Sequence, residues 1–284
     1  MKLARFDAGQ GPSPGLVREG GIVDLRKAGK GLESISSIIA GGDAAMNRLN
    51  ALHASAAADY TLAEVRLLAP IERPGKFLAI GMNYQKHVAE SARIGVTAPK
   101  QQLWFNKQTS CISGPYDPIN PGVTEQLDYE VELGIVIGKS AKHATERTAH
   151  QHIFGYVVVN DVSARDWQFH SPTFTMGKSF DTHGPIGPWI VTADEIPDPH
   201  ALDLRCYVNG EIRQSSNTRE MIHNVYKQIE YLSTAFTLES GDLLATGTPE
   251  GVGIGMSPAT FLKVGDVVRC EIDGVGAIEN NVAI

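Results

Sequence analysis

Glu130 and Glu132 are two carboxylates that stand two residues apart in an otherwise apolar segment, LDYEVELGIVIG, over residues 127–138. The segment is typical of a strand. Alternate residues of a strand point to the same face, so both carboxylates project from one surface with their Cα atoms roughly 7 Å apart. An unpaired carboxylate inside a sheet costs several kcal/mol unless a cation or a proton offsets its charge. The pair therefore needs a neutralising partner, unless this face of the strand is simply solvated.

Asp161 is a third acid that can join this pair, because it ends another apolar strand candidate, YVVVND, at residues 156–161. An aspartate at a strand end is ordinarily a turn residue or a helix cap. Together with the two glutamates it can complete an oxygen-only ligand set, which suits Mg²⁺, Mn²⁺ or Ca²⁺ rather than zinc or copper. Three ligands leave about three positions of an octahedral ion open to water or substrate, as in a catalytic site.

Further polar residues stand close to these acids in the chain. Arg165 and Gln168 are neighbours on a helical turn, where the guanidinium can pair with a ligand carboxylate or a substrate anion. Lys178 lies in the glycine- and proline-rich loop MGKSFDTHGPIGP and can stabilise a developing oxyanion. His87 and Glu90 share one face of a short helix, where the glutamate can orient the histidine as a base. Each of these residues has a plain alternative as a solvated surface side chain.

The segment GDLLATGTPEGVGIG, residues 241–255, predicts a strand followed by a glycine-rich turn. It contains neither the Gly-Lys-Ser/Thr of a phosphate loop nor the spacing of a dinucleotide fold. Its backbone N–H groups and the Thr248 hydroxyl can hold a small carboxylate. A tight structural turn is an equally good explanation.

Composition excludes several classes of protein. The 284 residues include 32 acidic and 25 basic side chains, and no basic run that would follow a nucleic acid backbone. The sequence shows neither a signal peptide nor the roughly 20 apolar residues of a membrane span, so we expect a cytoplasmic protein with no membrane partner. The three cysteines, Cys111, Cys206 and Cys270, lack the spacing of a zinc site or a disulfide framework.

The predicted elements that must position the acids form a small unit over residues 1–70 and a strand-rich unit over residues 71–284. The first holds a hairpin around Gly20-Gly21 and a helix from Asp43 to residue 60. The second holds strands with turns at VNGEI and IDGVG, and helices near 85–95, 163–169 and 221–236. Because strands and helices do not alternate regularly, we expect a mixed α+β fold on an antiparallel or mixed sheet.

Five segments occur in a distinctive order: GMNYQKHVAE, DYEVELGIVIG, NDVSARDWQ, KSFDTHGPIGP and TGTPEGVG. Over roughly residues 70–284 this order resembles the fumarylacetoacetate hydrolase superfamily. The resemblance implies a mixed β-roll core, a small N-terminal α/β domain and a homodimer. It also implies one Mg²⁺ or Mn²⁺ ion held by Glu130, Glu132 and Asp161, which would be the neutralising partner of the two glutamates.

The resemblance also implies roles for single residues. His87 and Glu90 match a water-activating pair on a lid, and Lys178 matches a residue that contacts the oxyanion. The substrate contacts would come from Tyr84, Arg165, Gln168 and Lys178, and from Thr248 at the substrate carboxylate. The stretch LAIGMNYQKH lacks an additional aspartate ligand of the founding members, which argues against fumarylacetoacetate itself as the substrate.

The implied reaction is hydrolysis of a C–C bond in a 2,4-dioxo acid, a ketonic substrate, to give pyruvate and a second acid. The length and the small N-terminal domain resemble hydrolases of 2,4-diketo-3-deoxy sugar acids of the rhamnonate and fuconate type, which we favour. Acylpyruvate hydrolysis, oxaloacetate decarboxylation or tautomerisation, and isomerisation of hydroxymuconate-type diacids use related chemistry and remain alternatives. A non-catalytic scaffold that binds Ca²⁺ is the alternative from another class.

Overall fold

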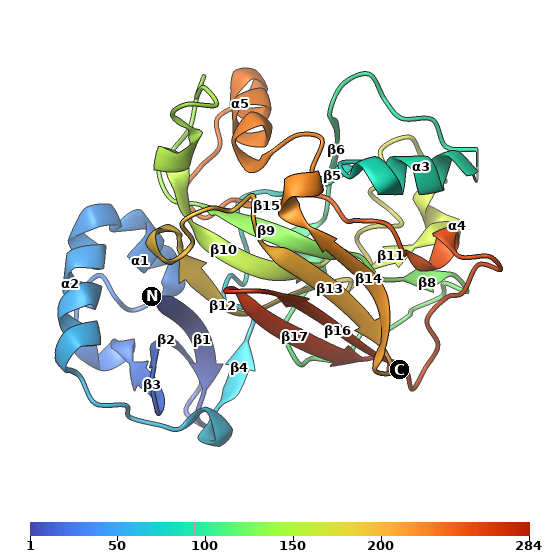
Figure 1. The fold of residues 1–284 in the computed structure, drawn as a ribbon. Coiled ribbons are helices and arrows are strands. Elements are labelled where there is room, and N and C mark those ends of the chain that lie inside the picture. Colours follow the sequence, from blue (N-terminus) through green and yellow to red (C-terminus); the bar gives the residue numbers. More distant parts are fainter. Residues whose placement is uncertain (94) are drawn as a thin grey trace.

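A large sheet runs through the molecule in this computed structural model, which describes residues 1–93 and 95–284 (Figure 1). Its strand order is β3-β2-β1-β12-β10-β9-β15-β5-β6, with β4 paired to β1 and β7 paired to β12. In that order the bounds are β3 Gly21–Asp24, β2 Pro12–Arg18, β1 Lys2–Asp7, β12 Gly184–Thr192, β10 Ile153–Asn160, β9 Val131–Ile137, β15 Leu243–Ala245, β5 Phe77–Gly81 and β6 Leu103–Asn106, with β4 Arg66–Leu68 and β7 Ile112–Ser113.

A four-stranded antiparallel sheet packs against the large one, in the order β14-β13-β16-β17. Its strands are β13 Asp203–Val208, β14 Glu211–Asn217, β16 Val267–Ile272 and β17 Gly276–Asn281. A small pair, β8 Leu127–Asp128 and β11 Ser163–Ala164, lies next to the short helix α4 in the chain. In Figure 1 the orange and red strands of the second sheet lie beside the green strands β9 and β10.

The helices are few and mostly short. They are α1 Ile35–Ala40, α2 Gly42–Ser55, α3 Gln85–Arg93, α4 Arg165–Gln168 and α5 Val225–Ala235. Single turns of 3₁₀ helix cover Leu25–Ala28, Leu62–Glu64, Thr109–Cys111, Ala149–His152, Ala193–Glu195, Thr218–Glu220 and Gly253–Gly255. Within the described ranges, no helix is long and apolar enough to cross a membrane.

Strands β9 and β10 are buried on both faces, which explains their continuous apolar sequence. Ile135 packs into a core shared with the four-stranded sheet, whereas its neighbour Val136 packs into a second core shared with α1 and α2. The alternation of a strand thus divides one apolar run between two cores. Polar side chains at the ends of these strands are therefore held by a rigid interior.

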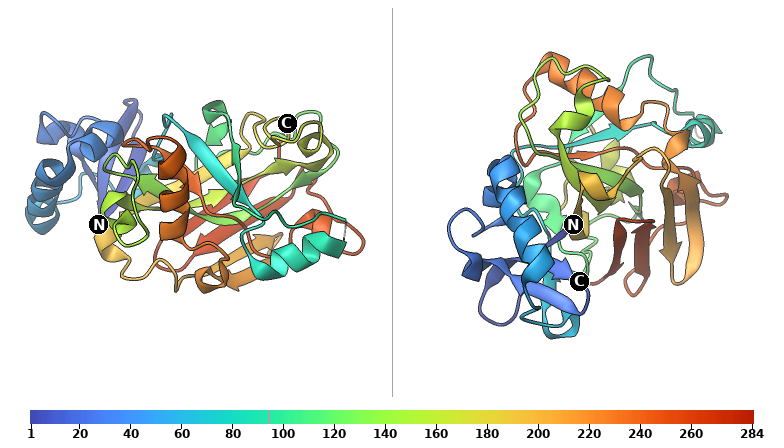
Figure 2. Two further views of the ribbon diagram at one scale, coloured as in Figure 1. Left: turned by 90° about the horizontal axis from the view of Figure 1, so that it is seen from above. Right: turned by 60° about the vertical axis from the view of Figure 1, so that its left-hand side comes forward.

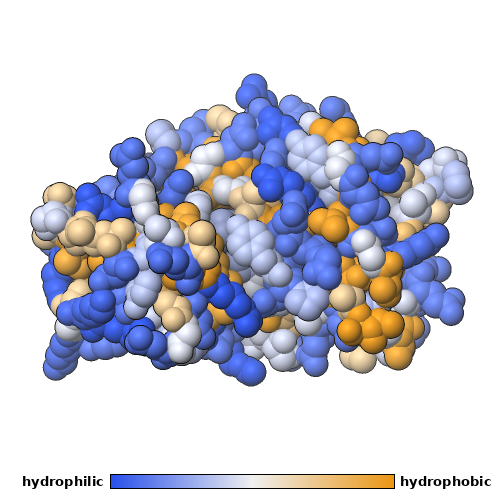
Figure 3. All heavy atoms as spheres, turned by 90° about the horizontal axis from the view of Figure 1, so that it is seen from below, coloured by the Kyte–Doolittle hydropathy of each residue, from blue (hydrophilic) through white to orange (hydrophobic). Residues whose placement is uncertain are grey.

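The predicted α+β fold is confirmed, with its hairpins at β2–β3, β13–β14 and β16–β17. The division at residue 70 stays a prediction. Residues 1–70 form one end of the molecule (Figure 2), yet β1 pairs with β12, so both units share one sheet. On the face drawn in Figure 3, hydrophilic side chains dominate and apolar ones form small separate patches, as on water-exposed surfaces in general.

Several predicted boundaries are wrong. The helix expected from Asp43 to residue 60 begins at Gly42 and ends at Ser55, and Gly41 rather than Asp43 is its N-cap. The helix expected over 163–169 shrinks to Arg165–Gln168, because Ser163 and Ala164 pair with β8. The helix expected over 221–236 begins only at Val225, where the Asn224 side chain caps it. The helix expected over 85–95 ends at Arg93, and Ile94 lies outside the described residues.

The single strand expected over 127–138 is two strands with a break at Tyr129 and Glu130. Side-chain oxygens accept hydrogen bonds from the N–H groups that would otherwise pair with a neighbouring strand. The N–H of Tyr129 donates to Asp128 Oδ1 at 2.9 Å, and the N–H of Glu130 donates to Asn160 Oδ1 at 3.0 Å. Glu130 therefore stands just before β9, and Glu132 lies within it.

Candidate active site

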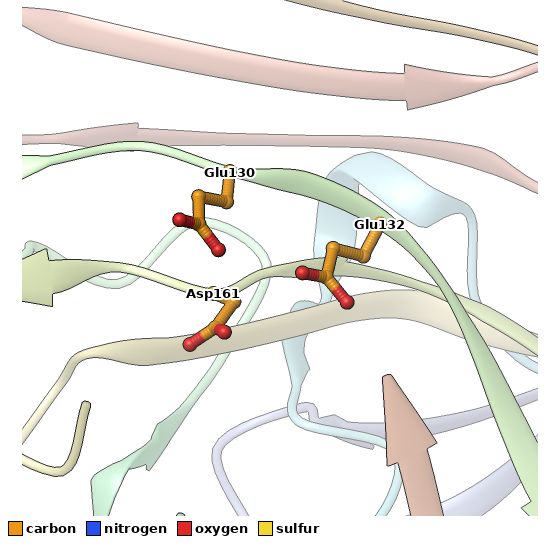
Figure 4. Close-up of side chains that lie close together, drawn as sticks. All are labelled: Glu130, Glu132 and Asp161. Carbon is orange, nitrogen blue, oxygen red and sulfur yellow. The ribbon is translucent and has the colours of Figure 1, made fainter. Parts of the chain in front are cut away.

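The structure brings together the three carboxylates of Glu130, Glu132 and Asp161, from segments far apart in the chain. Asp161 directly follows β10, which runs antiparallel to β9 with Asn160 opposite Val131. Each residue offers a carboxylate oxygen within 4.8 Å of the other two, and all three are buried. Figure 4 shows the three carboxyl groups gathered around a common space. The end of β10 and the start of β9 thus create one acidic centre.

The surroundings of Glu130 and Glu132 shift their pKa values in opposite directions. Burial, with the nearby charges of Asp161 and Glu130, raises the pKa of Glu132 well above its ordinary value. Although burial opposes it, the charges of Lys178 and Arg165 lower the pKa of Glu130 to about 2. A buried carboxylate such as Glu132, beside two other acids, is satisfied by a proton or a cation. The oxygen-only donor set fits a divalent ion such as Mg²⁺ or Mn²⁺.

Lys178 lies directly against two of these acids. Its Nζ is 2.7 Å from Glu130 Oε2 and 2.9 Å from Asp161 Oδ2. The side chain is buried and also lines the mostly apolar cavity beside the acids. Lys178 was predicted to contact substrate, and its ammonium lies between the acids and that cavity.

Arg165 is fixed on three sides. Its Nε donates to Asp128 Oδ2 at 2.8 Å, Nη1 donates to Gln168 Oε1 at 2.8 Å, and Nη2 forms an ion pair with Glu130 Oε1 at 2.7 Å. Asp128 in turn accepts the N–H groups of Gly253 and Ile254 at 2.7 and 3.0 Å. The guanidinium, which was predicted to pair with a ligand carboxylate or a substrate anion, therefore pairs with Glu130, one of the three acids of the centre.

Asp128 and Lys107 belong to the site although sequence reasoning missed both. Asp128 has the same two-residue spacing as Glu130 and Glu132, and this spacing could have drawn attention to it. Lys107 follows the apolar strand β6, is fully buried and donates to Asp161 Oδ1 at 2.6 Å and to the carbonyl of His183 at 3.0 Å. It also donates to the carbonyl of Lys178. No pattern in the neighbouring sequence predicts these partners of Lys107.

His87 and Glu90 form the predicted pair on α3. His87 Nδ1 lies 3.0 Å from Glu90 Oε2, and Glu90 Oε1 accepts the N–H of Gly251 at 3.0 Å. Because a carboxylate only accepts, this contact assigns the proton to Nδ1 and leaves Nε2 as the basic nitrogen. His87 lines the same cavity as Lys178.

The cavity beside the acids holds about 70 Å³ and has mostly apolar walls. Polar lining residues are His87, Ser91, Glu130, Arg165, Gln168, Lys178 and Thr248. The apolar ones include Ile80, Val96, Leu103, Phe105, Phe169, Phe174 and Ile254. The site is thus polar where the acids lie and apolar elsewhere.

Thr248 and Tyr84 differ in their relation to this cavity. Thr248 lines it, while its hydroxyl donates to the carbonyl of Val131 at 3.0 Å and accepts from Gln214 at 2.8 Å. Tyr84 is fully buried and does not line the cavity, and within residues 1–93 and 95–284 its hydroxyl has no hydrogen-bond partner. The substrate contact of Tyr84 stays a prediction, and in this arrangement the side chain lies outside the cavity lining.

Comparisons with known proteins agree with this geometry. A mitochondrial oxaloacetate tautomerase of Xenopus laevis is 42% identical over 290 residues, covering 99% of this chain and 90% of that protein. The solved structure of a fumarylacetoacetate hydrolase from Exiguobacterium antarcticum has a TM-score of 0.84 and 37% identity, with 99% of each chain covered. A crystal structure of maleylpyruvate hydrolase from Sphingobium sp. SYK-6, in complex with manganese(II) and pyruvate, has a TM-score of 0.81 and 32% identity, covering 100% of this chain and 99% of that one.

A family model described as fumarylacetoacetate (FAA) hydrolase C-terminal matches residues 76–283. This range includes the acidic centre, Lys178, Arg165 and the His87–Glu90 pair. The resemblance first indicated by five short segments therefore extends through the whole strand-rich part of the chain. The chain belongs to the fumarylacetoacetate hydrolase family, whose members are enzymes.

Proposed function

We propose that the protein is a Mg²⁺- or Mn²⁺-dependent enzyme that interconverts the keto and enol forms of a small 2-oxo acid, with oxaloacetate as the first candidate. The observation that carries this proposal is the oriented imidazole of His87, which lines one cavity with Glu130 and Lys178. A base beside a cation site suits proton transfer at a carbon next to a carbonyl. The identity of 42% with an oxaloacetate tautomerase supports this substrate.

The acids and the imidazole divide the chemistry. Glu130, Glu132 and Asp161 would hold the divalent ion, which would act as a Lewis acid on the 2-oxo group and make the neighbouring C–H more acidic. Nε2 of His87 takes the proton from C3, and the 2-oxo oxygen takes a proton from water to complete the enol. In the reverse direction the enol oxygen releases its proton to water and Nε2 returns a proton to C3. Glu90 keeps Nδ1 protonated and stabilises the imidazolium that forms when Nε2 is protonated.

The remaining polar residues position the substrate. The Lys178 ammonium can donate to an oxygen that gains negative charge, because it lies at the border between the acids and the cavity. Gln168 accepts from Arg165 through Oε1, which leaves its amide N–H₂ group for a substrate oxygen. Thr248 would meet the substrate carboxylate if its hydroxyl turned away from the carbonyl of Val131.

The experiment that tests this proposal follows the ultraviolet absorbance of enol-oxaloacetate with purified protein and added Mg²⁺ or Mn²⁺. We expect the protein to accelerate loss of the enol signal, and His87→Ala to remove most of the acceleration. Equal rates with and without the wild-type protein would refute tautomerisation. CO₂ release measured in the same samples distinguishes decarboxylation of oxaloacetate.

A second candidate function is hydrolysis of the C3–C4 bond of a 2,4-dioxo acid. The same oriented imidazole favours it, because Nε2 of His87 can take a proton from water that attacks C4. The C3–C4 bond then breaks, C4 becomes a carboxylic acid, and C3 takes a proton to give pyruvate. The maleylpyruvate hydrolase with bound manganese and pyruvate supports this candidate.

The tail beyond C4 decides which 2,4-dioxo acid fits. A 2,4-diketo-3-deoxy sugar acid carries hydroxyl groups that would face Val96, Leu103 and Phe169, which cannot hydrogen bond to them through their side chains. An acylpyruvate with an apolar tail matches these walls better. Release of pyruvate from a sugar acid, an acylpyruvate and maleylpyruvate, measured with one enzyme preparation, ranks the three. Isomerisation of a hydroxymuconate-type diacid is followed by its own absorbance change.

The homodimer and the cytoplasmic location stay predictions. Light scattering of the purified protein tests the first. Fractionation of the source cells tests the second, and it matters because the tautomerase of Xenopus laevis is mitochondrial.

A further inference from the structure

Each carboxylate of the acidic centre has one oxygen taken by a donor from outside the centre. Lys107 Nζ lies 2.6 Å from Asp161 Oδ1. Arg165 Nη2 lies 2.7 Å from Glu130 Oε1, and the N–H of Gly247 donates to Glu132 Oε2 at 2.7 Å. The three donors come from the end of β6, from α4 and from the loop after β15.

Two further oxygens, one from Glu130 and one from Asp161, face a single cation on the inner side of the centre. Glu130 Oε2 and Asp161 Oδ2 share the ammonium of Lys178 at 2.7 and 2.9 Å. Because Lys178 is a single cation on these inner oxygens, it marks the side from which a metal ion would be bound. Outer and inner oxygens are thus distinguished by their partners.

We propose that Lys107, Arg165 and the Gly247 N–H restrict the three acids to one metal-facing oxygen each, so that the site selects Mg²⁺ or Mn²⁺ over Ca²⁺. Ca²⁺ prefers six to eight oxygen ligands and commonly takes both oxygens of a carboxylate. Mg²⁺ demands an octahedral arrangement and keeps several waters. Three single oxygens suit the octahedral ion and leave Ca²⁺ short of ligands.

Lys107 is the strongest of the three restraints and is a positioning residue. Its ammonium donates to Asp161 Oδ1 and to the carbonyls of Lys178 and His183, so all three of its N–H bonds are used. It is fully buried, so water cannot replace it cheaply. Rotation of Asp161 to present both oxygens would leave this ammonium without its carboxylate.

The test is a comparison of Mn²⁺, Mg²⁺ and Ca²⁺ binding by wild type and Lys107→Met. Mn²⁺ binding is measured by loss of the free-ion electron paramagnetic resonance signal, and Mg²⁺ and Ca²⁺ by competition. Partners that orient metal ligands typically change metal affinity about 10- to 100-fold. We expect the ratio of the Ca²⁺ to the Mn²⁺ dissociation constant to fall at least tenfold in the variant. The ratio cancels the effect of the lost charge, which acts alike on two divalent ions.

Lys76→Met is the matched control, because Lys76 also pairs with a buried acid, Asp242, but lies outside the acidic centre. It should leave the ratio unchanged. An equal change of all three affinities in Lys107→Met would overturn the proposal. If that variant does not fold, a crystal structure of the wild type with Mn²⁺ decides: binding through both oxygens of Asp161 contradicts the proposal. Neither readout depends on the substrate, so failure here is separate from failure of the proposed function.

Discussion

The carboxylate of Glu90 fills the space that a β-carbon on Gly255 would occupy, so a side chain at this position would have to displace it. A β-carbon built on Gly255 would lie 2.3 Å from Glu90 Cδ and 2.5 Å from Oε1. The N–H of Gly251, in the same loop, donates to the same Oε1 at 3.0 Å. The loop after β15 therefore holds the residue that orients His87, and a change in this loop reaches the proposed base without touching it.

Gly255→Ala should displace Glu90 and disorient His87 while the acids keep their metal. A positioned base contributes about 10²- to 10⁴-fold to a rate. We expect turnover to fall by part of that range, with Mn²⁺ affinity unchanged. Steady-state rates and a metal titration check this. Ala259→Ser, an exposed position in the same loop, is the control. Full activity of Gly255→Ala would mean that the position of the Glu90 carboxylate against this loop is not needed for catalysis.

Replacement of the base itself should have the larger effect. His87→Ala is expected to lower turnover by about 10²- to 10⁴-fold and to leave metal binding intact, because His87 contacts Glu90 rather than the acids. Glu90→Gln should give a smaller loss, since an amide can still accept from Nδ1 but does not stabilise the imidazolium. If the His87 variant turns over at the wild-type rate, another group is the base.

Lys178→Met should tighten metal binding and at the same time lower the rate of catalysis. The ammonium shares inner oxygens of Glu130 and Asp161, so its removal is expected to tighten Mn²⁺ binding. Loss of one donor to a developing oxyanion typically lowers kcat by about 10²- to 10³-fold. Electron paramagnetic resonance gives the affinity and steady-state kinetics the rate. Weaker Mn²⁺ binding in this variant would show that Lys178 supports the ion instead of competing with it.

Acid should destabilise the fold through His183. Burial, with the charge of Lys107, lowers the pKa of His183 to about 4 from its ordinary value of 6.5, although its hydrogen bond to the carbonyl of Asn120 opposes the shift. The unfolded chain takes up a proton between these values and the folded chain does not. Stability is thus complete above pH 6.5 and falls by about 1.4 kcal/mol for each pH unit down to about 4.

His183→Gln removes this titration while keeping an N–H donor for Asn120. Urea unfolding of both proteins, measured from neutral to acidic pH, gives the difference in their free energies of unfolding. The advantage of the wild type should shrink as the pH falls below 6.5. A constant difference across this range would contradict the assignment of the acid effect to His183.

Chelation should abolish activity and preserve the fold. The hydrophobic cores around β9 and β10 form without any metal ligand, so EDTA is expected to leave the far-ultraviolet circular dichroism unchanged. Activity should return when Mg²⁺ or Mn²⁺ is added. Loss of structure on chelation, with no turnover under any condition, would favour the scaffold that binds Ca²⁺.

The acids of the site were predictable because each stands out from the residues next to it in the sequence. Glu130 and Glu132 interrupt an apolar run at the two-residue period of a strand, and Asp161 ends the next apolar strand. The pair on α3 is visible at helical spacing in the same way. The convergence of Asp161 with the glutamates was a hypothesis from their residue types that the resemblance supported, since nothing local pairs β9 with β10.

Lys107 shows what local reasoning cannot reach. Its partner Asp161 is 54 residues away in the chain. Lys107 follows a short strand and has a long flexible side chain, so the strand pattern does not indicate where its ammonium lies. The break between β8 and β9 was not predicted for a related reason. The acceptor of the Glu130 N–H is the Asn160 side chain, which comes from another strand. The division at residue 70 stays a prediction, because composition changes there while the pairing of β1 with β12 joins the two parts in one sheet.

The three outer donors join parts of the chain that are made at very different times during synthesis. Lys107 reaches 54 residues forward to Asp161, and Gly247 reaches 115 residues back to Glu132. A nascent chain that has not yet reached Gly247 lacks one of the groups that hold the acids in place. We therefore expect only the finished protein to bind the ion tightly, so bound Mn²⁺ would count the native molecules in a refolding mixture.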